Sequence, residues 1–260
     1  MFKRFSTYVL LILTSTLTAG CGVTDWVSSN EMKPEEIIQS AQINMQQLES
    51  IRTEGTSVLE GNLLGSSFEY QMHTVSQSKL KKGSPVETYM ETSMLGEGIP
   101  ERTETIYFSD TQYGAYNPST SSWDITDFTA EDQATVQLFL SSFDPSSSLN
   151  KYADSKIKQD LKIIGKEDVN GVSCIGISIE TDADELIKDM TPALTAIAGE
   201  SMNLAASIAG GMVKDINLEY WIGEADSLVY GMNMELTTPF GNYHSDVKVY
   251  DHNEPFELPK

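Results

Sequence analysis

Cysteine, histidine and basic residues are all scarce in this sequence. The 260 residues include two cysteines, three histidines, and 17 lysines and arginines against 38 aspartates and glutamates. The formal net charge of -21 argues against binding to nucleic acid and against lying flat on an anionic membrane. The histidines are His73, His244 and His252, and no HExxH or CxxC pattern occurs, so the sequence offers little for a zinc site.

A long hydrophobic run is also missing. The longest apolar stretch near the N-terminus, Tyr8 to Leu13, is far shorter than the roughly 20 residues that span a hydrocarbon core. Lys3 and Arg4 precede it and small residues follow it. This order of segments is typical of an export signal, so residues 1–20 are predicted to be a signal peptide and not a permanent transmembrane helix.

The small residues Thr18, Ala19 and Gly20 stand directly before Cys21. This arrangement resembles the lipobox of bacterial lipoproteins, although Thr18 occupies the position where leucine is commonest. The resemblance implies that Cys21 is diacylated, becomes the first residue of the mature chain and anchors it to the cell membrane on the extracytoplasmic face. Two acyl chains would hold where one is reversible. The alternative is an incidental small residue in an ordinary secreted precursor.

Residues 21–32 are predicted to be a polar tether that carries the lipid. Loss of residues 1–20 would remove Lys3 and Arg4 and no acidic residue, which moves the formal charge from -21 to -23. An acylated Cys21 would leave Cys174 without a partner for a disulfide. Cys174 lies in the apolar run VNGVSCIGISIE and is therefore predicted to be a buried free thiol.

Hydrophobic periodicity predicts one helix followed by many strands. Apolar residues recur at helical spacing from Ile37 to Ile51, after a start at Pro34. From Thr53 to about Asn117 the period changes to two, which predicts four or five consecutive strands in an antiparallel meander. Two more strands are expected on either side of Asn170-Gly171, a strong hairpin dipeptide, and three strands close the chain.

Two segments break this alternation. Residues 129–143 have a helical start signal and a short apolar face, and residues 182–213 are rich in Ala, Met, Gly and Ile. Both are predicted to be helical blocks that cover the sheet. The expected fold class is therefore α+β, in one domain over residues 33–260: a strongly curved antiparallel sheet of about ten strands, a half-barrel covered by an N-terminal helix and inserted helices.

This arrangement resembles the LolA/LppX-like group of exported proteins, and more narrowly the uncharacterised Gram-positive lipoproteins of that group. The resemblance rests on PEEIIQSAQINMQQLESIRTEG, EDVNGVSCIGISIE, LEYWIGEADSLVYGMNMEL and VYDHNEPFELP. It implies a half-barrel in which a helix and a helical lid enclose an apolar cavity. Better-studied members of the wider group carry lipid chains, lipoproteins or glycolipids.

No pattern for bond chemistry is found, so no catalytic residue, metal site or cofactor is predicted. The nearest run to GxSxG is GVSCIG, which has isoleucine in place of the second glycine and lies in an expected strand. The acidic run TDADELIKD lacks the glycine and the glutamate of a calcium loop, and an acidic helix start explains it. Carboxylate pairs are uninformative among 38 acidic residues.

Alternating apolar and aromatic residues are the basis of the functional hypothesis. They either fill an ordinary core or line a cavity for a hydrophobic ligand. The 11 methionines, which adapt to irregular partners, and the apolar segment 190–213 favour the cavity. The candidate cavity residues are Phe68, Tyr70, Met72, Met90, Tyr220, Ile222, Met232, Met234 and Leu236.

The leading hypothesis is thus a membrane-anchored lipoprotein that binds or carries an acyl-chain or lipid ligand between sheet and helices. The first alternative is a non-enzymatic module for envelope interaction or sensing, with a filled core and an acidic surface. The second is an enzyme, which would need converging polar side chains in a pocket. The sequence leaves open the ligand, its transfer or sensing, the oligomeric state and any protein partner.

Overall fold

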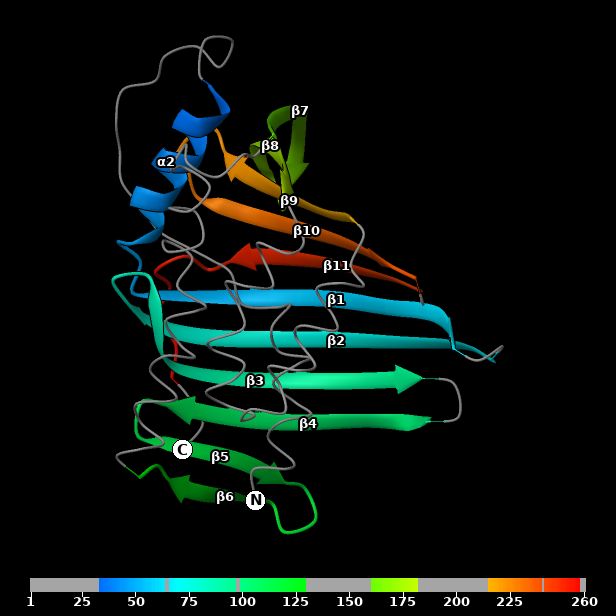
Figure 1. Cartoon of the computed structure of the whole chain (residues 1–260). Coiled ribbons are helices and arrows are strands. Elements are labelled where there is room, and N and C mark those ends of the chain that lie inside the picture. Colours follow the sequence, from blue (N-terminus) through cyan, green and yellow to red (C-terminus); the bar gives the residue numbers. More distant parts are fainter. Residues whose placement is uncertain are drawn as a thin grey trace.

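The computed structural model describes residues 33–63, 66–96, 99–129, 160–181, 215–239 and 241–257. In these residues one helix, α2 (Pro34–Met45), accompanies a single antiparallel sheet of 11 strands (Figure 1). The strands are β1 (Ser50–Leu63), β2 (Ser66–Lys81), β3 (Ser84–Gly96), β4 (Ile99–Ser109), β5 (Gln112–Asn117), β6 (Ser122–Asp127), β7 (Asp160–Val169), β8 (Val172–Thr181), β9 (Asp215–Gly223), β10 (Val229–Thr238) and β11 (Gly241–Tyr250).

Helix α2 begins where the sequence predicts. Pro34 stands in its first turn, where a missing N–H removes no helical hydrogen bond. Glu35 and Glu36 follow in the same turn, and the Glu36 carboxylate accepts a hydrogen bond from the backbone N–H of Lys33 at 3.3 Å. Negative charge at this end is favoured by the helix dipole. No helix in the described part of the chain is long and apolar enough to cross a membrane.

The end of α2 corrects the sequence interpretation. The apolar period continues to Ile51, but the helix stops at Met45, and Ile51 belongs to β1. Leu48 lies in the connection and Ile51 on the strand, yet their side chains are only 1% and 4% exposed. A turn followed by a strand brings both side chains to the same core as Met45. Leu48 and Ile51 therefore keep the three-residue spacing of a helix although they are not helical.

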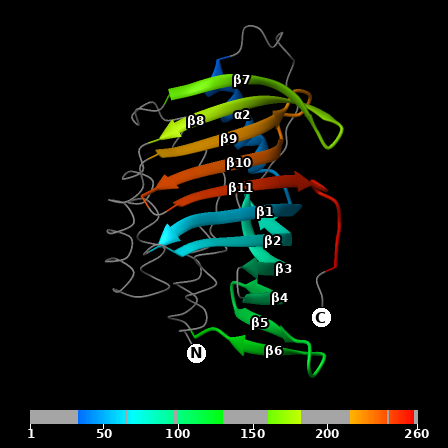
Figure 2. The same cartoon turned by 90° about the vertical axis from the view of Figure 1, so that its right-hand side faces the viewer.

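The order of strands in the sheet is β6-β5-β4-β3-β2-β1-β11-β10-β9-β8-β7. The first and last strands, β1 and β11, therefore pair in the middle of the sheet, with Arg52 opposite Tyr250 and Gly61 opposite Gly241. Strands β1 to β6 form a meander on one side of this seam, and β7 to β11 form one on the other (Figure 2). The two edge strands are β6 and β7.

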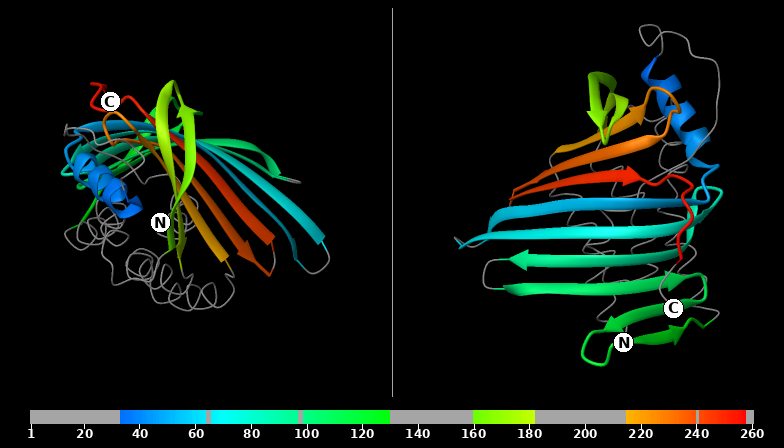
Figure 3. Two further views of the ribbon diagram at one scale, coloured as in Figure 1. Left: turned by 90° about the horizontal axis from the view of Figure 1, so that it is seen from above. Right: turned by 180° about the vertical axis from the view of Figure 1, so that it is seen from behind.

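The sheet is bent into an open arch, with α2 inside the bend across one end of the strands (Figure 3). The register shifts at four places, after Ile163, Lys79, Met94 and Val229. Such β-bulges increase local twist and bend the strand that carries them. The face that α2 covers is called the inner face below, and the opposite face is called the outer face.

The hairpin predicted at Asn170-Gly171 is confirmed. Val169 pairs with Val172, so these two residues form the whole turn between β7 and β8. Both have positive φ, 53° for Asn170 and 83° for Gly171. Asparagine and glycine are the residues that accept this conformation most readily, which explains why the dipeptide indicated the turn.

The predicted fold class is confirmed, with differences in detail. The sheet has 11 described strands where about ten were expected, because β6 was not foreseen. Its sequence, SWDITD, is short and has only two apolar residues, Trp123 and Ile125, which is a weak signal for a strand. The two predicted helical blocks, residues 129–143 and 182–213, lie outside the described residues apart from Thr129, as do the signal peptide and the tether.

The core lies between α2 and the inner face of β8 to β11. Ile38, Ala41 and Met45 of α2 are buried against strand residues that alternate along β8 and β9. On β9 the inner side chains are Ile216, Leu218, Tyr220 and Ile222, each at most 5% exposed. At about 25 cal/mol per Å² of apolar surface removed from water, this cluster is a major source of stability.

Candidate ligand-binding face

Strand pairing brings the nine candidate cavity residues to one face of the sheet. Met232 lies opposite Tyr220, and Met234 lies opposite Leu218. Side chains of directly opposite residues point to the same side of a sheet, so each pair extends the inner face by one strand. Following the register from β9 to β3 places all nine inside the arch: Phe68, Tyr70, Met72, Met90, Tyr220, Ile222, Met232, Met234 and Leu236.

Five of these residues are buried: Met72 and Met90 are 7% and 0% exposed on β2 and β3, and the other three are part of the packed core. Tyr220 and Ile222 are each 2% exposed and Met232 is 1% exposed, in the same cluster as Ile38 and Met45 of α2. Their surroundings are other side chains of the protein. The faces of the strands were thus predicted correctly, while contact of these three residues with a ligand stays a prediction.

Other candidates lie farther from α2, where the inner face is less covered. Ile51 marks the α2 end of β1, and Leu59 lies eight positions along, about 26 Å away at the usual rise per residue. Leu59 is 39% exposed and lies opposite both Tyr70 and Tyr243. Phe68 is half-buried, with its ring 5.7 Å from that of Tyr70. Apolar and aromatic surface is therefore accessible at this end.

Met234 and Leu236 continue that accessible region onto β10. Both are half-buried and pack against the edge of the core cluster. Leu236 lies opposite Tyr243 of β11, which in turn lies opposite Leu59 of β1. We call this region the distal apolar strip; it consists of Leu59, Phe68, Tyr70, Met234, Leu236 and Tyr243.

The inner face of β1, β2, β3 and β11 also carries a set of hydroxyl groups that sequence reasoning did not single out. They bond in pairs across neighbouring strands, at oxygen–oxygen distances from 2.7 to 3.2 Å. Each pair consists of directly opposite residues. The pairs are Thr53 with Ser76, Ser57 with Ser245, Thr74 with Thr92, and Ser78 with Thr88.

These hydroxyl pairs divide the inner face by polarity. Ser76 and Ser245 are each 1% exposed, so their hydroxyls are satisfied by the protein and not by bulk water. A buried hydroxyl without a partner would be costly, and pairing removes most of that cost. The half of the face on β8 to β10 is apolar, whereas the half on β1 to β3 mixes these hydroxyls with Met72 and Met90.

Strand β4 carries a pair of opposite charges on the inner face, Arg102 and Glu104. Arg102 is opposite Met94 and Glu104 is opposite Thr92, so both project from the inner face. Their side chains form an ion pair, with exposed fractions of 69% for Arg102 and 24% for Glu104. In the sequence, Arg102 and Glu104 alternate with Thr103 and Thr105, and this two-residue period predicts that Arg102 and Glu104 lie on one face of the strand.

Cys174 and His252 are both largely buried in the described part of the structure. Cys174 is a free, fully buried thiol, as predicted, and burial raises its pKa to about 12. His252 lies 3.0 Å from the carbonyl oxygen of Val229 and packs against the ring of Tyr230. Burial lowers the pKa of His252, so its imidazole is favoured in the neutral form.

No metal centre is found in the described ranges, where no three His, Cys, Asp or Glu side chains come together. His73 and His244 lie apart on the outer face, each beside a glutamate. The Nε2 atom of His73 is 3.0 Å from the Glu54 carboxylate, and Nδ1 of His244 is 3.7 Å from the Glu235 carboxylate. The solvent-facing position predicted for His73 is confirmed by a side chain that is 47% exposed.

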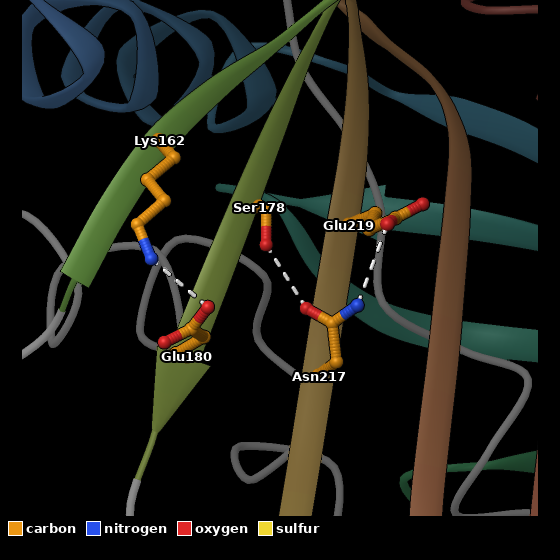
Figure 4. Close-up of polar contacts among 5 residues, drawn as sticks. All are labelled: Lys162, Ser178, Glu180, Asn217 and Glu219. Carbon is orange, nitrogen blue, oxygen red and sulfur yellow. Dashed lines mark hydrogen bonds and ion pairs between the residues drawn. The ribbon is translucent and has the colours of Figure 1, made fainter.

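Polar side chains on the outer face of β7 to β9 bond to one another (Figure 4). The Lys162 ammonium is 3.0 Å from the Glu180 carboxylate, and Ser178 donates a hydrogen bond to Asn217 at 2.9 Å. Asn217 in turn donates to Glu219 at 3.4 Å. The first two contacts cross between neighbouring strands and the third lies within β9, and together they make the outer face polar at this end of the sheet. The candidate binding surface is therefore the inner face.

Several solved structures are similar to this chain. The chain is similar to LprF from Mycobacterium bovis, with 12% identity and a TM-score of 0.48 over 87% of this chain and 96% of that one. It is similar to lipoprotein LppX from Mycobacterium tuberculosis, with 11% identity and a TM-score of 0.44 over 85% and 98% of the two chains. It is also similar to a LolA superfamily protein from Nitrosomonas europaea, with 8% identity and a TM-score of 0.28 over 88% of this chain and 96% of that one.

The open curved antiparallel sheet with a helix across one end is the arrangement that the sequence patterns indicated. No family model matches the sequence, and no curated protein matches it either.

Proposed function

We propose that this chain is an extracytoplasmic lipoprotein, anchored to the cell membrane through a diacylated Cys21, that binds or carries a hydrophobic ligand. The ligand is an acyl chain or an acyl-bearing lipid, held on the inner face of the sheet between strands and helices. Residues 1–20 are the signal peptide, residues 21–32 the tether and residues 33–260 the binding domain. No bond is made or broken in this function.

The observation that carries the proposal is the distal apolar strip. A filled core would cover its apolar side chains as completely as it covers Tyr220 and Met232. Instead Leu59 is 39% exposed, and Phe68, Tyr70, Met234 and Leu236 are half-buried on the inner side of an open arch. Apolar surface that is concave and accessible is the usual material of a lipid site.

Hydrophobic burial would supply the binding energy. An acyl chain that covers a few hundred Å² of apolar surface gains several kcal/mol at about 25 cal/mol per Å², before the cost of association. The strip continues from β10 across β11 and β1 to β2, so a chain can lie across these strands. The hydroxyl pairs are already bonded to each other and give an alkyl chain no comparable gain.

The competing function is an interaction or sensing module with a filled interior. It draws support from the complete burial of Tyr220, Ile222 and Met232. The two functions differ in a simple observable. A carrier purified without detergent should release lipid into an organic extract, and native mass spectrometry should show its added mass. A filled module should show neither.

Variants of β10 make this test specific. Met234→Asp places a carboxylate in the strip, whereas Asn233→Asp adds the same charge on the outer face. We expect Met234→Asp to lower uptake of a fluorescent fatty acid by about tenfold or more, because the charge must lose water to contact the alkyl chain. Asn233→Asp should bind as the parent does. Equal uptake by both variants, or no uptake by the parent, would contradict a binding site on this face.

A further inference from the structure

A cluster of aromatic rings lies on the outer face of β3 to β6, away from the proposed lipid site. The ring of Trp123 is 5.5 Å from that of Tyr116 and 6.3 Å from that of Tyr89, with interplanar angles of 62° and 68°. Tyr107 lies opposite Tyr89 in the neighbouring strand. We call these four residues, Tyr89, Tyr107, Tyr116 and Trp123, the outer aromatic cluster.

A glycine makes room for this cluster. Gly114 of β5 lies between Tyr107 of β4 and Ile125 of β6. A Cβ atom at Gly114 would come within 2.7 Å of Ile125 Cδ1 and 3.2 Å of Trp123 Cε3. The side chains of Trp123 and Ile125 therefore lie over the bare backbone of β5. This brings Trp123 of β6 into contact with Tyr89 of β3, across β5 and β4.

The cluster is partly open to solvent. Tyr116 is 37% exposed and Ile125 is 49% exposed, and the side chains of Trp123, Tyr89 and Tyr107 are half-buried. Tyrosine and tryptophan at a partly exposed position are the residues most enriched at protein interfaces.

The surroundings of the cluster are acidic. Residues 84–129 contain eight acidic residues and a single basic one, Arg102. Arg102 projects from the inner face, where it pairs with Glu104. The outer face of β3 to β6 thus holds exposed Glu91 beside the rings, and Lys79 on the neighbouring strand β2 is already paired with Glu87 at 2.7 Å. Burial raises the pKa of the Tyr89 phenol, and the charge of Glu91 raises it further.

We propose that the outer aromatic cluster binds a basic segment of a partner protein, through arginine or lysine side chains that stack on its rings. The electron-rich face of tryptophan or tyrosine attracts a cation within about 6 Å of the ring centre, and a nearby carboxylate adds to this attraction. Charge selects this partner, because a protein of formal charge -21 repels acidic proteins and anionic lipid surfaces alike.

The test measures binding of a labelled peptide of alternating arginine and glycine to the purified full chain by fluorescence anisotropy. Trp123→Leu and Tyr116→Leu remove rings from the cluster, and Glu91→Gln removes a charge. Leu95→Ala is the matched control, because Leu95 is 52% exposed on the same face and carries no ring. Circular dichroism verifies that each variant folds, and a peptide with glutamate in place of arginine verifies the sign of the charge.

The expected result is saturable binding of the arginine peptide that weakens about two- to tenfold in each ring variant and in Glu91→Gln. Binding should also weaken as salt is raised, since exposed charges are screened. The control should bind as the parent does. If a ring variant fails to fold, Glu91→Gln still decides the matter, because its side chain is exposed.

Four results would overturn the proposal. The first is the lack of saturable binding, and the second is an equal loss in Leu95→Ala, which would indicate general apolar adhesion. The third is Trp123-dependent binding to phosphatidylcholine vesicles in place of the peptide, which would make the cluster a membrane contact. The fourth is Trp123-dependent dimerisation in sedimentation, which would make a second copy the occupant. Lipid uptake on the inner face is measured separately and is independent of all four.

Discussion

The side-chain amide of Asn44 donates a hydrogen bond to the backbone carbonyl of Asp226, at 2.8 Å, across a separation of 182 residues. Asn44 lies in the last turn of α2, and Asp226 lies in the turn between β9 and β10. The Asp226 carboxylate accepts two further hydrogen bonds, from the Leu228 N–H and the Tyr230 hydroxyl. This turn therefore holds the helix across the end of the sheet.

Asn44→Ala should loosen that attachment. The substitution leaves a carbonyl without its partner in a region where Asn44 is only 7% exposed, so we expect a loss of about 1–2 kcal/mol in the free energy of unfolding. Ile43→Ala is the control, because Ile43 is 50% exposed on the same helix and should change stability by less than about 0.5 kcal/mol. Urea titration measures both. An Asn44→Ala protein as stable as the control would show that the contact contributes nothing.

Met232→Asp should destabilise the protein far more than Asn233→Asp. Met232 is 1% exposed inside the core cluster, so a carboxylate there must be buried unpaired or protonated. We expect a loss of roughly 3 kcal/mol or more, and a smaller loss of about 1 kcal/mol for Asn233→Asp, whose carboxylate would lie opposite Glu219 on the outer face. Thermal unfolding of both variants is the measurement. Equal tolerance would mean that the faces of β10 are assigned the wrong way round.

The Cys174 thiol should be inert in the folded protein. Its pKa is raised from 9.0 to about 12 by burial and by the charge of Asp226, so it stays protonated at pH 8. In a Cys21→Ser background, iodoacetamide should label Cys174 only after denaturation.

The same shift of the Cys174 pKa predicts how stability depends on pH. The thiol in the unfolded chain loses its proton above about pH 9, while the folded protein keeps it. Its contribution to stability is therefore full below pH 9 and is lost as the pH rises toward 12. A Cys174→Ala protein should lack this part of the alkaline loss. Rapid labelling of the native thiol at pH 8 would contradict the assignment.

Cys21→Ser should abolish the anchor. Without a thiol to acylate, the protein should leave the membrane fraction or remain there as the uncleaved precursor. Cys174→Ala, which changes the other cysteine, should fractionate and mature as the parent does. Cell fractionation combined with intact-protein mass spectrometry distinguishes these states. A Cys21→Ser protein that matures and stays on the membrane would show that the lipobox interpretation is wrong.

Local patterns predicted the elements well. The two-residue period of β2 and β10 assigned Met72 and Met234 to the inner face. The dipeptide Asn170-Gly171 correctly predicted the hairpin between β7 and β8. These predictions succeed because they depend only on neighbouring residues. The predicted end of α2 was wrong because burial of Leu48 and Ile51 depends on the tertiary fold. They reach the core through a turn and a strand that happen to keep helical spacing.

The candidate site was predicted only in part. Sequence reasoning placed Tyr220 and Met232 with Tyr70 and Phe68 in one group, whereas α2 buries the first two and leaves the others accessible. The hydroxyl pairs were not predicted, although Thr88 and Thr92 stand two residues before and after Met90 and therefore share its face of the strand. A serine on one strand reveals its role only when the strand register supplies the partner.

The sequence by itself determined most of the strands, which side of the long strands is apolar, and where the Asn170-Gly171 hairpin turns. These properties follow from side-chain period and turn chemistry, which act over a few residues. Only the tertiary structure decided that β1 pairs with β11, that serine meets serine across that seam, and that α2 covers one end of the arch. Those features depend on contacts between residues up to about 200 positions apart, which no local pattern encodes.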